Sequence, residues 1–243
     1  MKVKTGRAGY FIGELRFRII SSSIAVIVGS IISYVFYDTI MHYLIYPLKE
    51  VERSAGGNIL FVNAIAEAFI VKMKVSMISG IILTVPFHLY SVIRFLYPAL
   101  FPKERRILIL CSICSFFLAV TGVIFAYKYI VPLSVGFLTG GMFSPPGIGV
   151  LINLSSYVDN LIMMVAGIVV AFQLPVLAEV LMIMDILKRK TLMKAGRIII
   201  VGIFILSAVI TPPDFVSQIA IAIPLIILYF AVLAVSYIFK FGN

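Results

Sequence analysis

Acidic residues are scarce in this 243-residue chain, so the position of each one is informative. The chain has 10 Asp and Glu against 20 Lys and Arg, and Glu14 and Glu104 both lie among cationic neighbours. A carboxylate there can pair locally, Glu14 with Arg18 four residues on, and Glu104 with Lys103 or Arg105. It can also bind an incoming guanidinium, because the planar fork of arginine donates two parallel hydrogen bonds to a carboxylate. The residues alone leave both interpretations open.

The other reactive side chains do not form a catalytic or metal site. Cys111 and Cys114 have a Cys-x-x-Cys spacing, but no second pair exists, so we expect reduced thiols that pack as small side chains. His42 and His88 lie in different segments, without partners at a zinc-ligand spacing. Protease and nucleotide-binding fingerprints such as Gly-x-Ser-x-Gly, Gly-x-Gly-Asp and His-Glu-x-x-His are absent. We therefore expect no enzymatic activity, no cofactor and no metal.

The elements that carry these residues must lie in lipid. Hydrophobic residues make up 62% of the chain and charged residues 12%, and the mean hydropathy is +1.16. One soluble core of this size could not bury so much apolar surface. The runs stay apolar for about twenty residues, whereas the strands of a membrane barrel would alternate apolar and polar positions. The sequence therefore predicts an all-α membrane protein.

Six transmembrane helices are expected, in a single integral membrane domain of residues 1–243. Their expected bounds are about 19–37, 68–92, 107–131, 155–181, 198–210 and 216–239. Pro132 should end the third helix, and Pro224 should interrupt the sixth. The fifth is only roughly 20 Å long and should not cross the bilayer unaided. With helices five and six short, we expect a concave bundle.

The distribution of positive charge assigns the two sides of the membrane. Five Lys and Arg precede the first span, which places the amino terminus in the cytoplasm. After six crossings the carboxyl terminus is also cytoplasmic. The net charge of +10 thus follows topology and does not indicate a nucleic-acid partner. Only five Lys and Arg fall outside the segments expected on the inner side: Lys49, Arg53, Lys72, Lys74 and Lys128.

Several stretches, in order from about residue 10 to 235, resemble the TatC family. The most specific is Phe95-Leu-Tyr-Pro98-Ala-Leu100-Phe-Pro-Lys-Glu104-Arg105-Arg106, which is similar to the family's Phe-x-x-Pro-Gly/Ala-Leu…Glu-Arg signature. Glu14-Leu-Arg16-Phe-Arg18 resembles Glu-Leu-Arg-x-Arg, and Phe172-Gln173-Leu-Pro175 resembles Phe-Glu-x-Pro. Thr211-Pro-Pro-Asp214 with Ser217-Gln218 is similar to the last outer turn, and Pro47 to an outer proline.

The resemblance implies the receptor subunit of the twin-arginine translocase, in the cytoplasmic (inner) membrane of a prokaryote. Such a subunit binds Arg-Arg signal peptides at its cytoplasmic face and nucleates assembly with TatA/TatB-type single-span subunits to export folded proteins. Self-association of the chain stays open. The implied signal-peptide contacts are Glu14, Arg16, Phe95, Pro98, Leu100, Glu104 and Arg105. The implied intramembrane or partner contacts are Pro47, Gln173, Pro175 and Asp214.

Two positions depart from the family pattern. Gln173 stands where TatC proteins commonly carry Glu, and Phe11 stands where the first motif has His. An amide can hydrogen-bond a neighbouring helix but cannot ionise, so no buried carboxylate is expected at position 173. Glu179 lies about 240° further around the helix and does not replace it. We expect Glu179 at the cytoplasmic interface.

Two other functions remain as alternatives. In a secondary transporter of a small solute or ion, Asp159, Gln173 and Glu179 would line the path. That function would favour broken helices in paired halves, and no such pairing is evident. In a purely structural assembly subunit, Glu14 and Glu104 would be dispensable.

Overall fold

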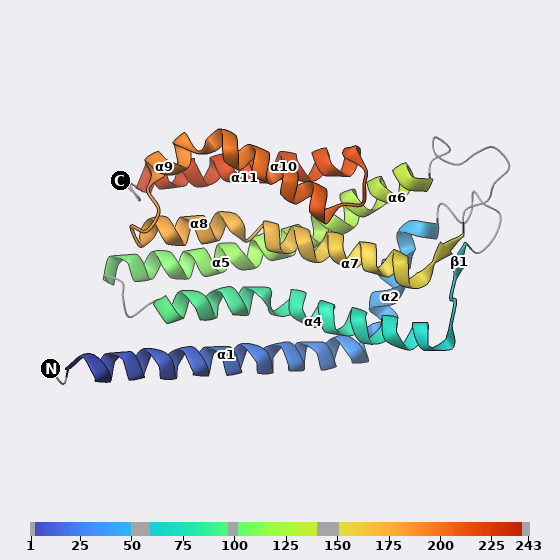
Figure 1. The fold of residues 1–243 in the computed structure, drawn as a ribbon, viewed down its shortest axis with the longest axis horizontal. Helices are drawn as coiled ribbons and strands as arrows, with labels where there is room; N and C mark the ends of the chain where they lie inside the picture. The colour runs from blue at the N-terminus through green and yellow to red at the C-terminus, as the bar shows by residue number, and fades with distance from the viewer. Residues whose placement is uncertain (1–2, 50–58, 97–101, 140–150, 240–243) are drawn as a thin grey trace.

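The computed structural model describes residues 3–49, 59–96, 102–139 and 151–239, and nearly all of these are helical. The side chains of residues 3–12, 93, 95–96, 102–108 and 139 lie outside the described part. Figure 1 shows long helices lying side by side along one common direction. The elements are α1 (Val3–Val35), α2 (Tyr37–Ile45), η1 (Tyr46–Leu48), β1 (Leu60–Phe61), α4 (Ile65–Leu96), α5 (Pro102–Phe125), η3 (Ala126–Ile130), α6 (Val131–Thr139), β2 (Ile152–Asn153), α7 (Leu154–Ala171), α8 (Leu174–Ile183), α9 (Arg189–Lys194), α10 (Gly196–Ile210) and α11 (Phe215–Phe239).

Five of the described helical stretches are long and apolar enough to cross a membrane. They are Gly13–Val35, Ile65–Val92, Ile109–Leu138, Leu154–Ile183 and Phe215–Phe239, and the shorter apolar helix is Gly196–Ile210. The expected all-α membrane fold is therefore confirmed. Of the two helices expected to be short, only α10 is short, with 15 residues. α11 has 25 residues and continues through Pro224.

The third span does not end at Pro132, contrary to the expectation from sequence. α5 passes into the π-helical turn η3 and then into α6, which carries Pro132 and ends at Thr139. Proline lacks an N–H and crowds the carbonyl four residues earlier, here that of Lys128. Lys128 lies in the π turn, where the hydrogen-bonding register is already altered. The turn therefore lets the helix pass through the proline.

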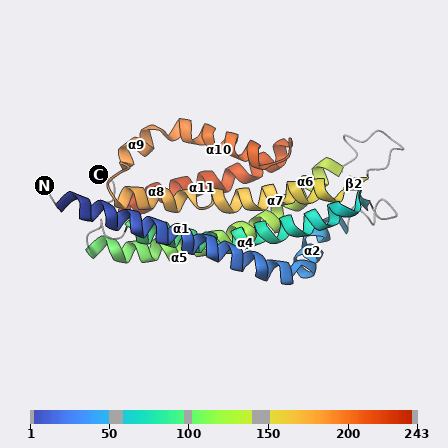
Figure 2. The ribbon, with the colours of Figure 1, turned by 60° about the horizontal axis from the view of Figure 1, so that its bottom comes forward.

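The amino-terminal helix is held against the rest of the molecule chiefly by α4. α1 and α4 lie side by side along much of their length in Figures 1 and 2. The two helices approach closely at Gly29 and Gly80, where a Cβ on Gly80 would overlap the backbone of Ser30. Small residues at a crossing let two backbones approach closely, which is how helices associate in lipid. Gly80 thus fixes where α1 rests.

α7 and α8 form the centre of the bundle, and a two-residue break separates them. α7 supplies buried Val158, Met164 and Ile168 to the main core cluster. α8 begins with Pro175 in its first turn, which accounts for the break because the first turn is the part of a helix that proline favours. A Cβ on Gly167 of α7 would overlap Ile210, so α10 packs tightly there.

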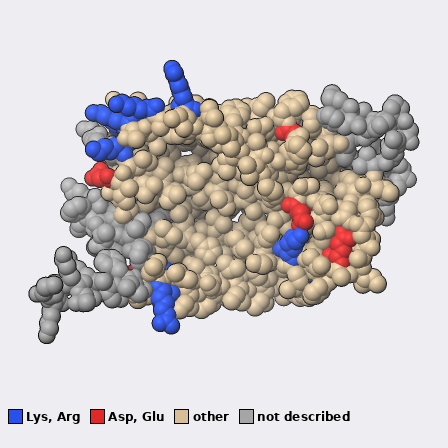
Figure 3. Space-filling view, viewed as in Figure 1, with Lys and Arg blue, Asp and Glu red and all other residues tan. Residues whose placement is uncertain are grey.

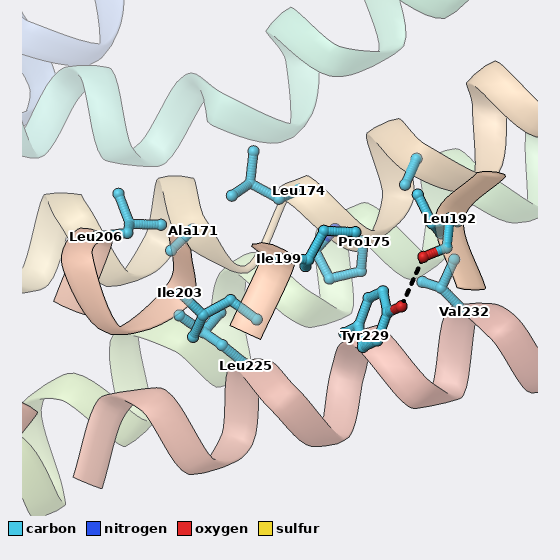
Figure 4. Close-up of a pocket in the computed structure, with 11 residues that line it drawn as sticks. Ala171, Leu174, Pro175, Leu192, Ile199, Ile203, Leu206, Leu225, Tyr229 and Val232 are labelled. Atoms are coloured by element: carbon cyan, nitrogen blue, oxygen red, sulfur yellow. Dashed lines mark hydrogen bonds between the residues drawn. The ribbon is translucent and has the colours of Figure 1, made fainter. Parts of the chain in front are cut away.

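The hairpin of α10 and α11 leaves a small apolar pocket beside α8 (Figure 4). Its volume is about 140 Å³, and Pro175, Ile203 and Leu225 are among its lining residues. The hydroxyl of Tyr229 donates a hydrogen bond of 2.9 Å to the carbonyl of Leu192. Figure 4 shows this bond at one edge of the pocket. It ties α11 to α9 at the chain reversal.

A cluster of polar contacts closes the end of the molecule where α2 and β1 lie in Figure 1. β1 and β2 pair in parallel, Leu60 opposite Ile152. Glu67 of α4 accepts hydrogen bonds from the backbone N–H groups of Asn63 at 2.7 Å and Ser155 at 3.1 Å. The carboxylate therefore joins the start of α4 to the start of α7.

Candidate functional site

The opposite end of the molecule, called here the basic end, carries most of the described positive charge. In Figure 1 α1 begins there, α4 ends, α5 begins, and α8 leads into α9. Figure 3 shows Lys and Arg gathered at this end, while the middle of the same face is almost free of charge. The described basic residues of these segments are Arg16, Arg18, Arg94, Lys188, Arg189, Lys190, Lys194 and Arg197.

Glu14 lies on α1 at the basic end and is paired within its own helix. Arg18 Nη2 donates to Glu14 Oε1 at 3.2 Å, the local i,i+4 pair that the sequence allows. Glu14 Oε2 and Arg18 Nε are shielded from solvent and have no hydrogen-bond partner among the described residues. The neighbouring side chains Leu15, Arg16 and Phe17 are exposed. Within the described residues, Glu14 thus has one hydrogen-bonded oxygen and one without a partner.

The second expected acid lies near the start of α5. Glu104 and Arg105 belong to the first turn of this helix, while their side chains lie outside the described part. Pro98 and Leu100 lie outside the described residues altogether, and only the backbone of Phe95 is described, within α4. Figure 1 places the start of α5 and the start of α1 at the same end of the molecule.

α4 separates the two helices that carry Glu14 and Glu104. α4 packs against both α1 and α5, and Figure 1 shows it between them. Packed helix axes are about 8–10 Å apart, so α1 and α5 are on the order of 20 Å apart. An extended peptide of about six residues spans that distance. One extended segment laid across the end of α4 can therefore reach both helices.

Gln173, which stands where the family pattern has Glu, forms hydrogen bonds through both its amide oxygen and its amide nitrogen inside the bundle. Ser115 Oγ of α5 donates to Gln173 Oε1 at 2.7 Å, and Gln173 Nε2 donates to the Ser115 carbonyl at 3.4 Å. Both side chains are buried. The amide therefore joins the break between α7 and α8 to α5, as a polar contact between membrane helices.

Glu179 differs from Gln173 in having no hydrogen-bond partner among the described residues. Its side chain lines a groove of about 420 Å³ between α5, α8 and α11. It is 8% exposed, and neither carboxylate oxygen has a hydrogen-bond partner within the described part of the chain. Sequence reasoning placed it at the cytoplasmic interface. It lies one helical turn before the end of α8, with its side chain buried in the protein. The apolar residues that cover it come from other helices, so the sequence pattern gave no signal.

Asp214 organises the turn between α10 and α11 at the far end. It is 3% exposed. Its Oδ1 accepts the backbone N–H of Ser217 at 2.6 Å, and its Oδ2 accepts from Ser134 Oγ at 2.9 Å. Asp214 therefore caps the start of α11 and ties it to α6. Pro47 lies in the 3-10 turn η1, where buried Leu48 anchors the chain.

Sequence reasoning missed two paired lysines on α4. Lys74 Nζ lies 2.6 Å from Asp159 Oδ1 of α7, and Lys72 lies over the rings of Tyr34 and Tyr37, 4.7 and 5.0 Å from their centroids. Partial burial, and secondly the charge of Asp38, raise the pKa of Tyr37, so its phenol stays neutral beneath the cation at pH 7. The partners are remote in sequence.

The residues of the expected transporter path do not come together. Asp159 is paired with Lys74, Gln173 with Ser115, and Glu179 lines a different groove. Asp159 and Glu179 are twenty residues apart along α7 and α8, or roughly 30 Å of helix. No group of three His, Cys, Asp or Glu that could hold a metal occurs among the described residues.

Comparison with known proteins identifies one family. The family described as Sec-independent protein translocase protein (TatC) matches residues 10–224. The TatC proteins of Carboxydothermus hydrogenoformans and Escherichia coli K12 are each 32% identical to this chain. The first match covers 88% of this chain and 86% of the relative, and the second covers 89% and 82%.

Solved structures agree with the sequence comparison. A crystal structure of the twin arginine translocase receptor TatC in DDM superposes with a TM-score of 0.80 at 29% identity, covering 96% of this chain and 99% of that one. A second crystal structure of the same receptor gives a TM-score of 0.78 at 29% identity, covering 94% and 98%.

Proposed function

Since this chain belongs to the TatC family of Sec-independent protein translocase proteins, we propose that it is the receptor subunit for twin-arginine signal peptides. Glu14 and Glu104 would bind the two guanidinium groups at the basic end, with Arg16, Arg105, Phe95, Pro98 and Leu100 completing the contact surface. The subunit would then nucleate assembly with TatA/TatB-type single-span partners in the bilayer.

The state of Glu14 is the observation that supports this proposal most directly. One of its oxygens already holds a guanidinium group, that of Arg18, while the other has no partner among the described residues. The Glu14–Arg18 contact is a single hydrogen bond between residues one helical turn apart, and such i,i+4 pairs contribute about 0.3–0.5 kcal/mol. An incoming arginine can therefore displace Arg18 at little energetic cost and engage both oxygens of Glu14. Arginine would be preferred to lysine because only its forked donors can engage both oxygens.

The spacing of the two acids explains why two adjacent arginines would be needed. Successive side chains of an extended segment point to opposite sides of the backbone. A signal peptide whose backbone crosses the end of α4 at right angles to the line from α1 to α5 would thus direct one guanidinium towards α1 and the next towards α5. The surrounding lysines and arginines, such as Lys188 and Arg189, would repel cationic peptides that fail to engage both acids.

A binding measurement on the protein in lipid nanodiscs tests the proposal. We expect a fluorescent peptide containing Arg-Arg to bind, its Lys-Lys counterpart to bind at least about tenfold more weakly, and Glu14→Gln and Glu104→Gln to reduce that preference. Asp185→Asn is the matched control, because Asp185 is an exposed acid at the same end, outside α1 and α5. Equal binding of both peptides by all variants would refute the proposal.

A further inference from the structure

The carboxylate of Glu179, which has no hydrogen-bond partner among the described residues, lies in an apolar groove outside the arginine site. This groove, called here the Glu179 groove, has a volume of about 420 Å³. Its walls include Phe117 of α5 and Ala231 and Val235 of α11. Pro175 and Val232 separate it from the smaller pocket of Figure 4, since both residues line each cavity.

Glu179 is energetically unfavourable in the protein as it stands. A buried carboxyl without a hydrogen-bond partner destabilises the fold by about 1–3 kcal/mol or more. Gln173, six residues earlier, shows that this part of the bundle can satisfy a buried polar side chain. Lipid tails offer no donor that could satisfy Glu179. A molecule bound in the groove could stabilise Glu179 by donating a hydrogen bond to its carboxyl group.

The length and position of the groove restrict what that occupant can be. Its lining runs from Leu110 to Thr121 on α5 and from Leu228 to Phe239 on α11. Each stretch is about 16 Å of helix, half of the roughly 30 Å hydrocarbon core. The groove lies in the half of the molecule nearest the basic end, where α5 begins and α11 ends. A full transmembrane helix is too long for it.

We propose that the Glu179 groove receives the apolar segment of a signal peptide, with the Glu179 carboxyl accepting hydrogen bonds from the N–H groups at the start of that segment's helix. An apolar segment of about 7–15 residues is typical of signal peptides, and eleven helical residues fill the 16 Å length. The first N–H groups of a helix are unpaired and carry partial positive charge, which an acid complements.

The path along α5 connects this groove to the arginine site. Glu104 lies in the first turn of α5, and Leu110 at the mouth of the groove follows six residues later, roughly 9 Å along the helix. A segment that leaves Arg-Arg at the basic end can therefore enter the groove directly. The inference thus rests on the proposed receptor function and extends it to the residues that follow the arginines.

Disulfide cross-linking to Cys114 tests the proposal, since this cysteine is exposed and lines the groove. The probe is a synthetic peptide with two adjacent arginines, about eleven Leu and Ala residues, and a single Cys placed at successive positions. With copper phenanthroline as oxidant in nanodiscs, we expect a disulfide to Cys114 from positions inside the apolar segment. Cys114→Ser should abolish it. Absence of cross-linking from every position, while Arg-Arg binding persists, would overturn the proposal.

Two tryptophan substitutions on α11 distinguish an effect of filling the groove from an effect of adding a large side chain to this helix. Ala231→Trp should fill the groove and weaken binding of the peptide at least about tenfold. Ala234→Trp places the same side chain on an exposed alanine of α11 that does not line the groove, and binding should be unchanged. Equal binding by both variants would overturn the proposal.

Substitution of Glu179 distinguishes a role in peptide binding from a purely structural role. Glu179→Leu should raise the melting temperature, because it removes a buried unpaired carboxyl, and should weaken peptide binding at least about tenfold. Unchanged affinity would remove Glu179 from the site. Equally efficient cross-linking of the Lys-Lys and Arg-Arg peptides to Cys114 would support peptide binding in the groove but refute the proposed recognition of twin arginines.

Discussion

Gln173 and Ser115 hold each other through two hydrogen bonds across 58 positions of the chain, and both are buried. The contact joins the helix break that precedes α8 to α5. It also shows what the amide at position 173 does in this protein. The amide connects α8 to α5, whereas the carboxyl of Glu179 has no hydrogen-bond partner among the described residues.

The contact predicts a strongly non-additive response to substitution. Ser115→Ala leaves Gln173 Oε1 without its donor and should lower the free energy of unfolding by about 1 kcal/mol. Ser115→Ala combined with Gln173→Met should cost less than the two single changes together, because no polar atom is then left unpaired. Thermal unfolding in one detergent measures all three variants. Additive losses would show that the two side chains do not act as a pair.

Gly80 should be intolerant of even one additional carbon. Gly80→Ala places a methyl group against the backbone of Ser30, so α1 must move, at an expected cost of about 1–3 kcal/mol. Gly202→Ala is the matched control, because no atom lies within 4 Å of its added Cβ. The control should stabilise α10 by up to about 1 kcal/mol. If both substitutions have the same effect, α1 does not rest on Gly80.

Asp214 should matter for stability at the far end of the bundle. Asp214→Ala removes the cap of α11 and leaves Ser134 without its acceptor, for an expected loss of about 1–3 kcal/mol. Asp214→Asn keeps an acceptor for the Ser217 N–H and should lose less. Comparison of their melting temperatures checks this order. Equal losses would mean that the negative charge matters more than the hydrogen bonds, because both variants lack the charge.

The pair between Lys74 and Asp159 should contribute little despite its 2.6 Å separation. Both side chains are substantially exposed, at 34% and 47%, and exposed pairs contribute about 0–1 kcal/mol. Lys74→Gln and Asp159→Asn should each change stability by less than that amount, and the difference from wild type should shrink in high salt. A loss of several kcal/mol would indicate a role beyond an exposed ion pair.

The sequence predicted the helices well because lipid imposes simple rules on composition. Long apolar runs and the charges at their ends sufficed for an all-α membrane fold, and the local motif sufficed for the Glu14–Arg18 pair. The continuation through Pro132 was missed because it depends on the π turn before it. Contacts between residues far apart in the chain, such as Lys74 with Asp159, leave no periodic signal in either segment.

The burial of Glu179 could not be predicted for a related reason. An acid near the end of an apolar run normally reaches the headgroups. The groove that encloses Glu179 is built by α5 and α11, whose sequences give no indication that they meet α8 at that position.

The proposed receptor function is tested most directly by the energetic coupling between Glu14 or Glu104 and the two arginines of the signal peptide. Dissociation constants would be measured for wild type, Glu14→Gln and Glu104→Gln, each with the Arg-Arg and the Lys-Lys peptide, and combined as double-mutant cycles. We expect a coupling free energy of about 1.5–3 kcal/mol for each acid, as for hydrogen bonds between charged groups. Coupling of zero for both acids, with Arg-Arg still preferred, would mean that the arginines bind elsewhere.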